Sequence, residues 1–102
     1  MIALLESKRQ EIALVCQRHR VRCLEVFGSA AVGSFDPQRS DVDLLVEFHP
    51  LGPGEHAEAY FGLLEDLQSL LGRPVDLVMP RAIQNPYFRR AIENTREVLY
   101  AA

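Results

Sequence analysis

The sequence predicts a small α+β fold, in which helices cover a mixed β-sheet of at least three strands. Residues 41–48 alternate between two faces with a period of two, which is typical of a strand. Residues 55–71 carry apolar side chains at helical spacing and are followed by Gly72 and Pro74, which favour a helix end. The segments follow one another as helix, strand, strand, helix, strand, helix, and this order indicates a sheet packed against helices.

Length and composition indicate one soluble globular domain over residues 1–102. Hydrophobic residues make up 48% of the chain and the net charge is −3, so the chain lacks the basic character of a protein that binds nucleic acid directly. No apolar run approaches the roughly 20 residues of a membrane span, and the N-terminus lacks a signal-peptide pattern. We therefore expect a cytoplasmic protein with no membrane partner, and we expect Cys16 and Cys23 to be reduced core residues.

The first third of the chain is expected to form a helix and then a strand. Residues 2–19 place apolar side chains near positions i, i+3, i+4 and i+7, which predicts an amphipathic helix. Residues 22–27 alternate as a strand does, until Gly28 and Ser29 break the pattern. Small side chains then favour a tight helical turn over residues 30–33.

Loops flank the central strand. Asp36-Pro37 marks residues 34–40 as a loop, and glycine and proline mark residues 49–54 as another. In the long helix that follows, the apolar stripe is expected to comprise Ala57, Tyr60, Phe61, Leu64, Leu67, Leu70 and Leu71.

The last third of the chain carries shorter elements. Residues 75–79 read as a third strand, residues 80–85 as a connector and residues 86–94 as a short helix. Residues 98–100 are expected to form an apolar tail.

Two acids lie on one side of the strand at residues 41–48. Because residues two apart in a strand point the same way, Asp41 and Asp43 lie roughly 6 to 7 Å apart on one face. Two such carboxylates repel each other unless they are protonated or bridged by a cation, and Mg²⁺ prefers oxygen ligands together with substrate phosphates. The pair therefore predicts either a site for one or two Mg²⁺ ions beside a nucleoside triphosphate or an acidic strand end that faces solvent.

The Gly28-Ser29 pair suits phosphate binding. A glycine lets the backbone approach a phosphate closely, the following helical turn points free N–H groups at it, and Ser29 Oγ adds a hydrogen bond. An ordinary strand-to-helix turn has the same sequence, so both interpretations stay open from these two residues alone.

Asp76 lies among apolar residues in the strand at residues 75–79. An acid buried there without a partner is costly. If this strand lies beside the one at residues 41–48, Asp76 completes the metal site or accepts the proton of an attacking hydroxyl. The alternative is an edge-strand acid that faces water.

Two other groups of residues are given simpler interpretations. His49 and His56 flank a loop without metal-ligand spacing and are expected at the surface. Four C-terminal side chains exceed what so small a chain is expected to bury, and they form either core or a face for a partner or a second copy, which would give a homo- or hetero-oligomer. They are Tyr87, Phe88, Leu99 and Tyr100.

Together the motifs resemble a known superfamily, the nucleotidyltransferase fold of DNA polymerase β. The resemblance rests on Gly28-Ser29, Gly33, Ser40-Asp41-Val42-Asp43-Leu44-Leu45-Val46 and Pro74-Val75-Asp76-Leu77-Val78. The short length and the ending resemble the minimal nucleotidyltransferase (MNT) subfamily, on the residues Asn85-Pro86-Tyr87-Phe88, Ile92 and Val98-Leu99-Tyr100. The resemblance covers nearly the whole chain.

The resemblance implies an antitoxin encoded beside a helical HEPN-domain ribonuclease toxin. Some members transfer AMP from ATP to a tyrosine near the toxin's active site and so inactivate the toxin. It implies that Asp41 and Asp43 bind two Mg²⁺ ions, that Asp76 is the third ligand and the base, and that Gly28 and Ser29 hold the β- and γ-phosphates. A hydroxyl would attack the α-phosphate of ATP, and pyrophosphate would leave.

Two positions depart from the family pattern. Members often have arginine directly after Gly-Ser and again two residues later, where this chain has Ala30 and Val32, and Arg39 is the nearby cation that would substitute. Fewer cations beside a triphosphate weaken its binding or the stabilisation of the leaving group. A second hypothesis is therefore an antitoxin that neutralises its toxin by contact alone. A third, an enzyme acting on a small molecule, is less favoured, because such relatives carry an additional helical domain that holds the acceptor.

Overall fold

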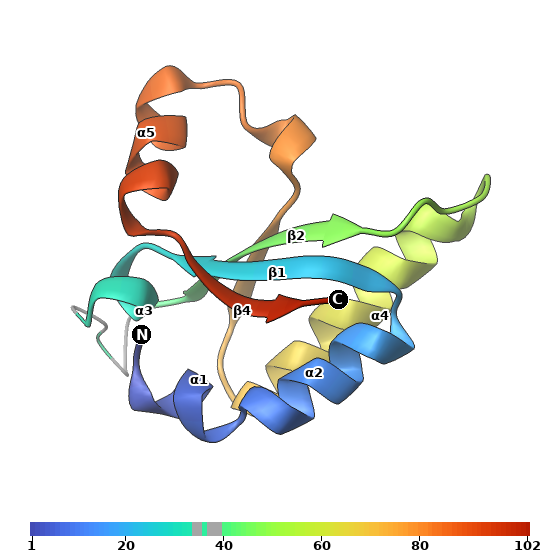
Figure 1. Cartoon of the computed structure of the whole chain (residues 1–102), viewed down its shortest axis with the longest axis horizontal. Helices are drawn as coiled ribbons and strands as arrows, with labels where there is room; N and C mark the ends of the chain where they lie inside the picture. Colours follow the sequence, from blue (N-terminus) through green and yellow to red (C-terminus); the bar gives the residue numbers. More distant parts are fainter. Residues whose placement is uncertain (34–35, 37–39) are drawn as a thin grey trace.

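A four-stranded sheet with the strand order β3-β2-β1-β4 forms the centre of the molecule (Figure 1). Strand β1 lies antiparallel to both β2 and β4, whereas β2 runs parallel to β3. The bounds are Val21–Phe27 for β1, Val42–Phe48 for β2, Val75–Val78 for β3 and Glu97–Ala101 for β4. The predicted α+β class and the mixed sheet are confirmed.

The computed structural model describes residues 1–33, Asp36 and residues 40–102. Most of the predicted loop at residues 34–40 therefore lies outside the described residues. No helix in the described part of the chain is long and apolar enough to cross a membrane.

Helices cover both faces of the sheet (Figure 1). On one face lie α1, α2 and α4, and on the other lies α5, which the chain reaches through the 3-10 turn η1. The bounds are Ala3–Ser7 for α1, Arg9–Arg18 for α2, Ser29–Val32 for α3, Glu55–Leu71 for α4, Pro80–Ala82 for η1 and Pro86–Thr95 for α5. Asn85 begins α5 because its side chain accepts the N–H of Tyr87 at 2.8 Å and Pro86 fits the first helical position.

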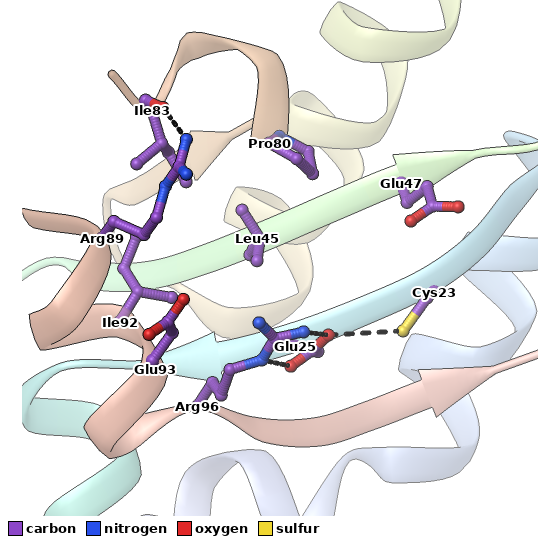
Figure 2. Close-up of a pocket in the computed structure, with 10 residues that line it drawn as sticks. All are labelled: Cys23, Glu25, Leu45, Glu47, Pro80, Ile83, Arg89, Ile92, Glu93 and Arg96. Atoms are coloured by element: carbon purple, nitrogen blue, oxygen red, sulfur yellow. Dashed lines mark hydrogen bonds and ion pairs between the residues drawn. The ribbon is translucent and has the colours of Figure 1, made fainter. Parts of the chain in front are cut away.

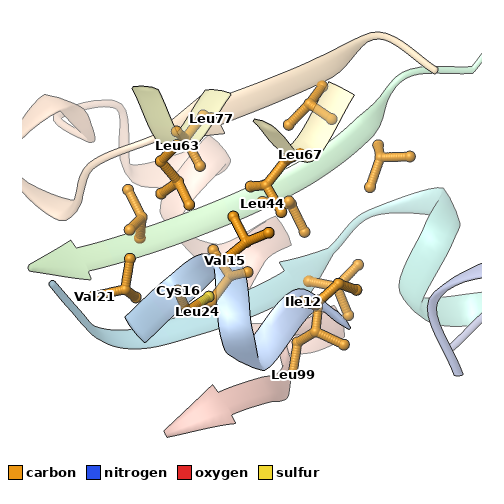
Figure 3. Close-up of a cluster of buried hydrophobic side chains, with 14 of the residues drawn as sticks. Ile12, Val15, Cys16, Val21, Leu24, Leu44, Leu63, Leu67, Leu77 and Leu99 are labelled. Carbon is orange, nitrogen blue, oxygen red and sulfur yellow. The ribbon is translucent and has the colours of Figure 1, made fainter. Parts of the chain in front are cut away.

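The main core lies between the sheet and the helices α2 and α4 (Figure 3). Leu63 and Leu67 of α4 are fully buried there, whereas Phe61 is 64% exposed. The predicted stripe of α4 is therefore wrong in part: the buried row is Ala59, Leu63, Leu67 and Leu71. The helix carries apolar side chains on more than one face. The side on which the sheet packs determines which of them are buried, and here it is the row of residues four apart.

Two predicted elements differ from the structure. The helix expected over residues 2–19 is interrupted at Lys8, whose φ of −115° leaves the helical range. No glycine or proline marks this break, so apolar periodicity alone does not show it. The expected tail at residues 98–100 is part of strand β4, which pairs with β1 through a register shift. Pairing satisfies the backbone groups that the edge of β1 would otherwise expose, and Leu99 enters the core.

The two cysteines are free, as expected. Cys16 is fully buried, and burial raises the pKa of its thiol to about 12, so this residue is an unreactive part of the core. Cys23 differs from the expectation, because it is only half-buried and lies on the opposite face of the sheet.

A polar contact joins α2 to α4. Nε2 of His19 donates to Oδ2 of Asp66 at 2.6 Å, and this bond lowers the pKa of the Asp66 carboxyl. The imidazole lies directly over Gly62, where a Cβ would be 2.7 Å from Cε1 of His19. Gly62 therefore makes room for the ring in the middle of a helix.

Replacing Gly62 by alanine is expected to destabilise the protein, although alanine ordinarily stabilises a helix interior by about 1 kcal/mol relative to glycine. The new methyl group would displace His19 from Asp66. In a His19→Ala background the same substitution should be stabilising, because the ring is gone. Urea unfolding of the four proteins of this cycle measures both signs, and stabilisation of the wild type by Gly62→Ala would contradict the steric argument.

Candidate active site

The register of the sheet brings two of the predicted site residues together. Strand β2 pairs with β3 in parallel, and the Cα of Asp43 lies opposite that of Asp76. Neighbouring strands are about 4.8 Å apart and opposed residues point to the same face, so the two side chains emerge next to each other. Asp76 is exposed on an edge strand, which is what the interpretation as a solvent-facing acid expected. Its strand also lies beside β2, which the interpretation as a site residue required.

Asp41 lies immediately before β2 rather than within it, and its side chain is exposed. The predicted start of this strand is therefore one residue too early. Two contacts tie this end of β2 to the start of β3: the N–H of Val42 donates to the carbonyl of Pro74 at 3.0 Å, and Nη2 of Arg73 donates to the carbonyl of Ser40 at 2.8 Å. Arg73 was not singled out from the sequence, because only the folded chain places it beside Ser40.

The carboxyl of Asp43 is half-buried beside two other acids. Burial raises the pKa of its carboxyl, and the charges of Asp76 and Asp41 raise it further, to about 6 from an ordinary 3.8. Among the described residues, no three His, Cys, Asp or Glu side chains converge closely enough to hold a metal ion. The three carboxylates therefore lie in one negatively charged region, but they do not converge on a single point in this structure.

The Gly28 turn packs directly against Asp43. Gly28 has φ +70° and ψ −149°, a conformation essentially restricted to glycine. A Cβ built on this residue would lie 2.7 Å from Oδ2 of Asp43. The backbone of the turn therefore touches the carboxylate, and no side chain fits between them.

The turn presents hydrogen-bond donors beside the acids. The N–H groups of Ala31 and Val32 donate to the carbonyl of Gly28 at 3.0 and 3.3 Å. In contrast, the N–H groups of Ser29 and Ala30 and the hydroxyl of Ser29 have no acceptor among the described residues. Donors of this kind, grouped on adjacent residues, suit the oxygens of a phosphate.

The two positions that depart from the family pattern have different surroundings. Ala30 is fully buried in the main core and contributes a small apolar side chain there. Val32 is 60% exposed, so an arginine at this position would reach solvent. Arg39 lies outside the described residues, and its role as a substitute cation stays a prediction.

A second, small core holds α5 over the sheet. Phe27, Leu45, Ile83 and Ile92 form this cluster, and Phe27 is the cross-strand partner of Asp43. The ring of Phe88 meets that of Phe27 edge to face, with centroids 5.9 Å apart.

The C-terminal side chains divide between core and surface. Leu99 is buried and Tyr100 packs partly against the core, whereas Phe88 is 41% and Tyr87 is 81% exposed. A partner or self-association face on α5 therefore stays a prediction.

A cavity of about 340 Å³ opens on the face of the sheet that α5 covers, between this helix and the strands (Figure 2). Its floor includes the Leu45–Glu25 and Glu47–Cys23 pairs but not Asp43. The cavity thus lies farther along the strands than the acids, and Leu45, Ile83 and Ile92 of the small core form part of its wall. None of the predicted site residues lines it. We therefore place the candidate site at the Gly28 turn and the acids rather than in this cavity.

Comparison with known proteins gives a family match and similar relatives at the level of sequence. A family model described as "Nucleotidyltransferase domain" matches residues 9–99. A protein of Methanocaldococcus jannaschii named "Putative protein adenylyltransferase" is 34% identical over 88 residues, which cover 86% of this chain and 86% of that protein.

Solved structures share the fold. One described as "Structure of putative minimal nucleotidyltransferase" is 32% identical, with a TM-score of 0.72, and the match covers 91% of this chain and 90% of the other. A complex of a tri-AMPylated Shewanella oneidensis HEPN toxin with an MNT antitoxin matches at 18% identity and a TM-score of 0.63, over 96% of this chain and 73% of the other. At that identity, the second likeness shows a common fold and nothing finer.

Proposed function

This chain belongs to the nucleotidyltransferase domain family, and from that premise we propose that residues 1–102 form one domain that transfers AMP from ATP to a hydroxyl of a partner protein. One observation carries the proposal: Asp43 lies opposite Asp76 and in contact with the Gly28 turn. Acids and phosphate-binding donors meet there at one end of the sheet, as transfer of a phosphoryl-linked group requires.

The Gly28-Ser29 turn is assigned to the β- and γ-phosphates of ATP. The N–H groups of Ser29 and Ala30 and the hydroxyl of Ser29 would donate to phosphate oxygens. With the leaving pyrophosphate held by the turn, the α-phosphate would lie toward the acids.

The three carboxylates are assigned to two Mg²⁺ ions. The donor set fits this cation, because all three groups are oxygen ligands. Burial, followed by the charges of Asp76 and Asp41, raises the pKa of Asp43, and a bound cation would offset the cost of its charge. Bound Mg²⁺ would supply positive charge to the phosphate oxygens in the transition state. Asp41, Asp43 and Asp76 would hold it, and Asp76, which is exposed, would also take the proton of the attacking hydroxyl.

The proposed acceptor is a tyrosine of a cognate helical HEPN toxin, and AMP transfer would neutralise that toxin. The Methanocaldococcus jannaschii relative named "Putative protein adenylyltransferase" supports a protein acceptor. The Shewanella complex, whose toxin is AMPylated, supports the pairing of this fold with a HEPN partner.

The function is tested by measuring the intact mass of the helical protein encoded beside this chain. Incubation with this chain, ATP and Mg²⁺ should add one or more AMP units to it. Asp76→Asn should prevent the gain. Glu47→Gln is the matched control, because Glu47 lies on the same face of β2 as Asp43 but is paired with Arg22 at 3.0 Å, and it should leave the gain intact. A stable complex without any mass gain would refute the enzymatic assignment.

The alternative is an antitoxin that neutralises by binding alone. Ala30 favours it, because a buried apolar side chain stands where members of the family often have an arginine. In that case a variant lacking all three carboxylates would still protect cells from the toxin. Loss of protection in this variant, with the complex preserved, would exclude binding as the sole mechanism.

A further inference from the structure

Thr95 connects the far end of the chain to the Gly28 turn. Its Oγ1 accepts the N–H of Gly28 at 2.9 Å, across 67 positions of sequence. The same oxygen donates to the carbonyl of Ala91 at 2.9 Å. A hydroxyl has one proton, and because that proton is directed at Ala91, the oxygen meets Gly28 as an acceptor only.

The hydroxyl of Thr95 is held in place by the packing of α5. Ile92, one turn earlier, is 2% exposed in the small core. Phe88 adds its edge-to-face contact with Phe27, the residue directly before Gly28. The helix is thus anchored on the strand that leads into the turn, and its last residue reaches the first N–H of that turn.

The turn is held from its other side as well. The N–H of Ile2 donates to the carbonyl of Ala30 at 2.9 Å. The Gly28 N–H is occupied by Thr95, so the donors left to face a ligand are those of Ser29 and Ala30. The contact with Thr95 also fixes the plane of the peptide between Phe27 and Gly28, at a glycine whose backbone is intrinsically free to rotate.

We propose that Thr95 is a positioning residue that orients the Gly28-Ser29 turn for the triphosphate of a nucleotide. This inference rests on the proposed function of the turn. Thr95 touches no substrate: it holds Gly28 so that the neighbouring N–H groups are directed at phosphate before the nucleotide arrives. Such preorganisation strengthens binding, because less freedom is lost when the ligand enters.

Three variants of the full chain test the proposal. Thr95→Val keeps the shape of the side chain and removes the acceptor, whereas Thr95→Ser keeps the hydroxyl. Asn85→Ala removes the N-terminal cap of α5 and serves as the matched control, because it weakens the same helix without touching Gly28. Measurements are the ATP affinity in the presence of Mg²⁺, the KM for ATP and kcat with the protein acceptor, and the hydrogen-exchange rate of the Gly28 amide.

We expect Thr95→Val to weaken ATP binding about tenfold, to raise the KM for ATP more than it lowers kcat, and to accelerate exchange of the Gly28 amide. Thr95→Ser should restore all three, and Asn85→Ala should leave the ATP affinity near that of the wild type. Unchanged or tighter ATP binding by Thr95→Val would overturn the inference, and so would an equal loss in Asn85→Ala. Neither result touches the proposed function, whereas a wild-type protein that binds no ATP would overturn both.

Discussion

Replacing Asp43 by asparagine is expected to abolish AMP transfer and, at the same time, to make the folded protein more stable at neutral pH. The two effects have one cause. Asp43 is held in a half-buried position beside Asp76 and Asp41, and this placement disfavours its charge. A charge that is costly to the fold is the one that the proposed metal site needs.

The pH dependence of stability has a definite sign. In the folded protein the pKa of Asp43 is about 6, above its ordinary 3.8. Between these values the folded state binds more protons than the unfolded state, so the free energy of unfolding falls as the pH rises through this window. At pH 7 the full penalty is present. One pKa unit corresponds to 1.36 kcal/mol, which sets an upper limit of about 3 kcal/mol, and solvent screening at this half-exposed group reduces it to about 1 to 2 kcal/mol.

Thermal unfolding of Asp43→Asn and wild type at pH 7 and near pH 4 measures this effect. The variant should melt about 5 to 10 °C higher at pH 7, and the difference should shrink near pH 4. Mg²⁺ should stabilise the wild type and not the variant. Glu47→Gln, the paired acid on the same face, should show no gain. An Asp43→Asn protein that still transfers AMP, or that is no more stable than the wild type, would contradict the assignment.

Replacing Gly28 by alanine is expected to destabilise the protein by about 2 to 4 kcal/mol and to eliminate nucleotide binding. The conformation of Gly28 costs any other residue about 1 to 3 kcal/mol. The added methyl group would also lie 2.7 Å from Oδ2 of Asp43. The variant would therefore either push the carboxylate aside or rotate the turn, and either movement disrupts the candidate site.

Urea unfolding separates the two contributions. Gly72 also has a positive φ, of 65°, but nothing lies within 4 Å of its Cβ position. The change in the free energy of unfolding caused by Gly72→Ala therefore measures the cost of a positive φ without a steric clash. In an Asp43→Ala background, Gly28→Ala should cost less than in the wild type, because the clashing oxygen is absent. Equal costs of Gly28→Ala in both backgrounds would mean that the turn does not press on Asp43.

Family and fold class were both accessible from the sequence, and both are confirmed. The motifs Gly28-Ser29, Asp41-x-Asp43 and Asp76 within its strand each lie within a few consecutive residues. Such short motifs can be recognised in the sequence without knowing how the other elements are arranged. The same holds for the start of α5 at Asn85-Pro86 and the end of α4 at Gly72, since caps depend on neighbouring residues. The catalytic and metal-binding roles of the acids remain predictions, for which the experiments above are the test.

Only the tertiary structure determined which residues distant in sequence are in contact. Pairing of β2 with β3 in one register, and not in a register shifted by one residue, sets Asp76 next to Asp43. The same is true of Thr95, whose sequence neighbours give no sign that it meets Gly28. The buried row of α4 and the strand at Glu97–Ala101 were likewise settled by packing and by the open edge of β1. Long-range pairing depends on how all the elements bury their apolar surface together, and no short stretch of the chain contains that information.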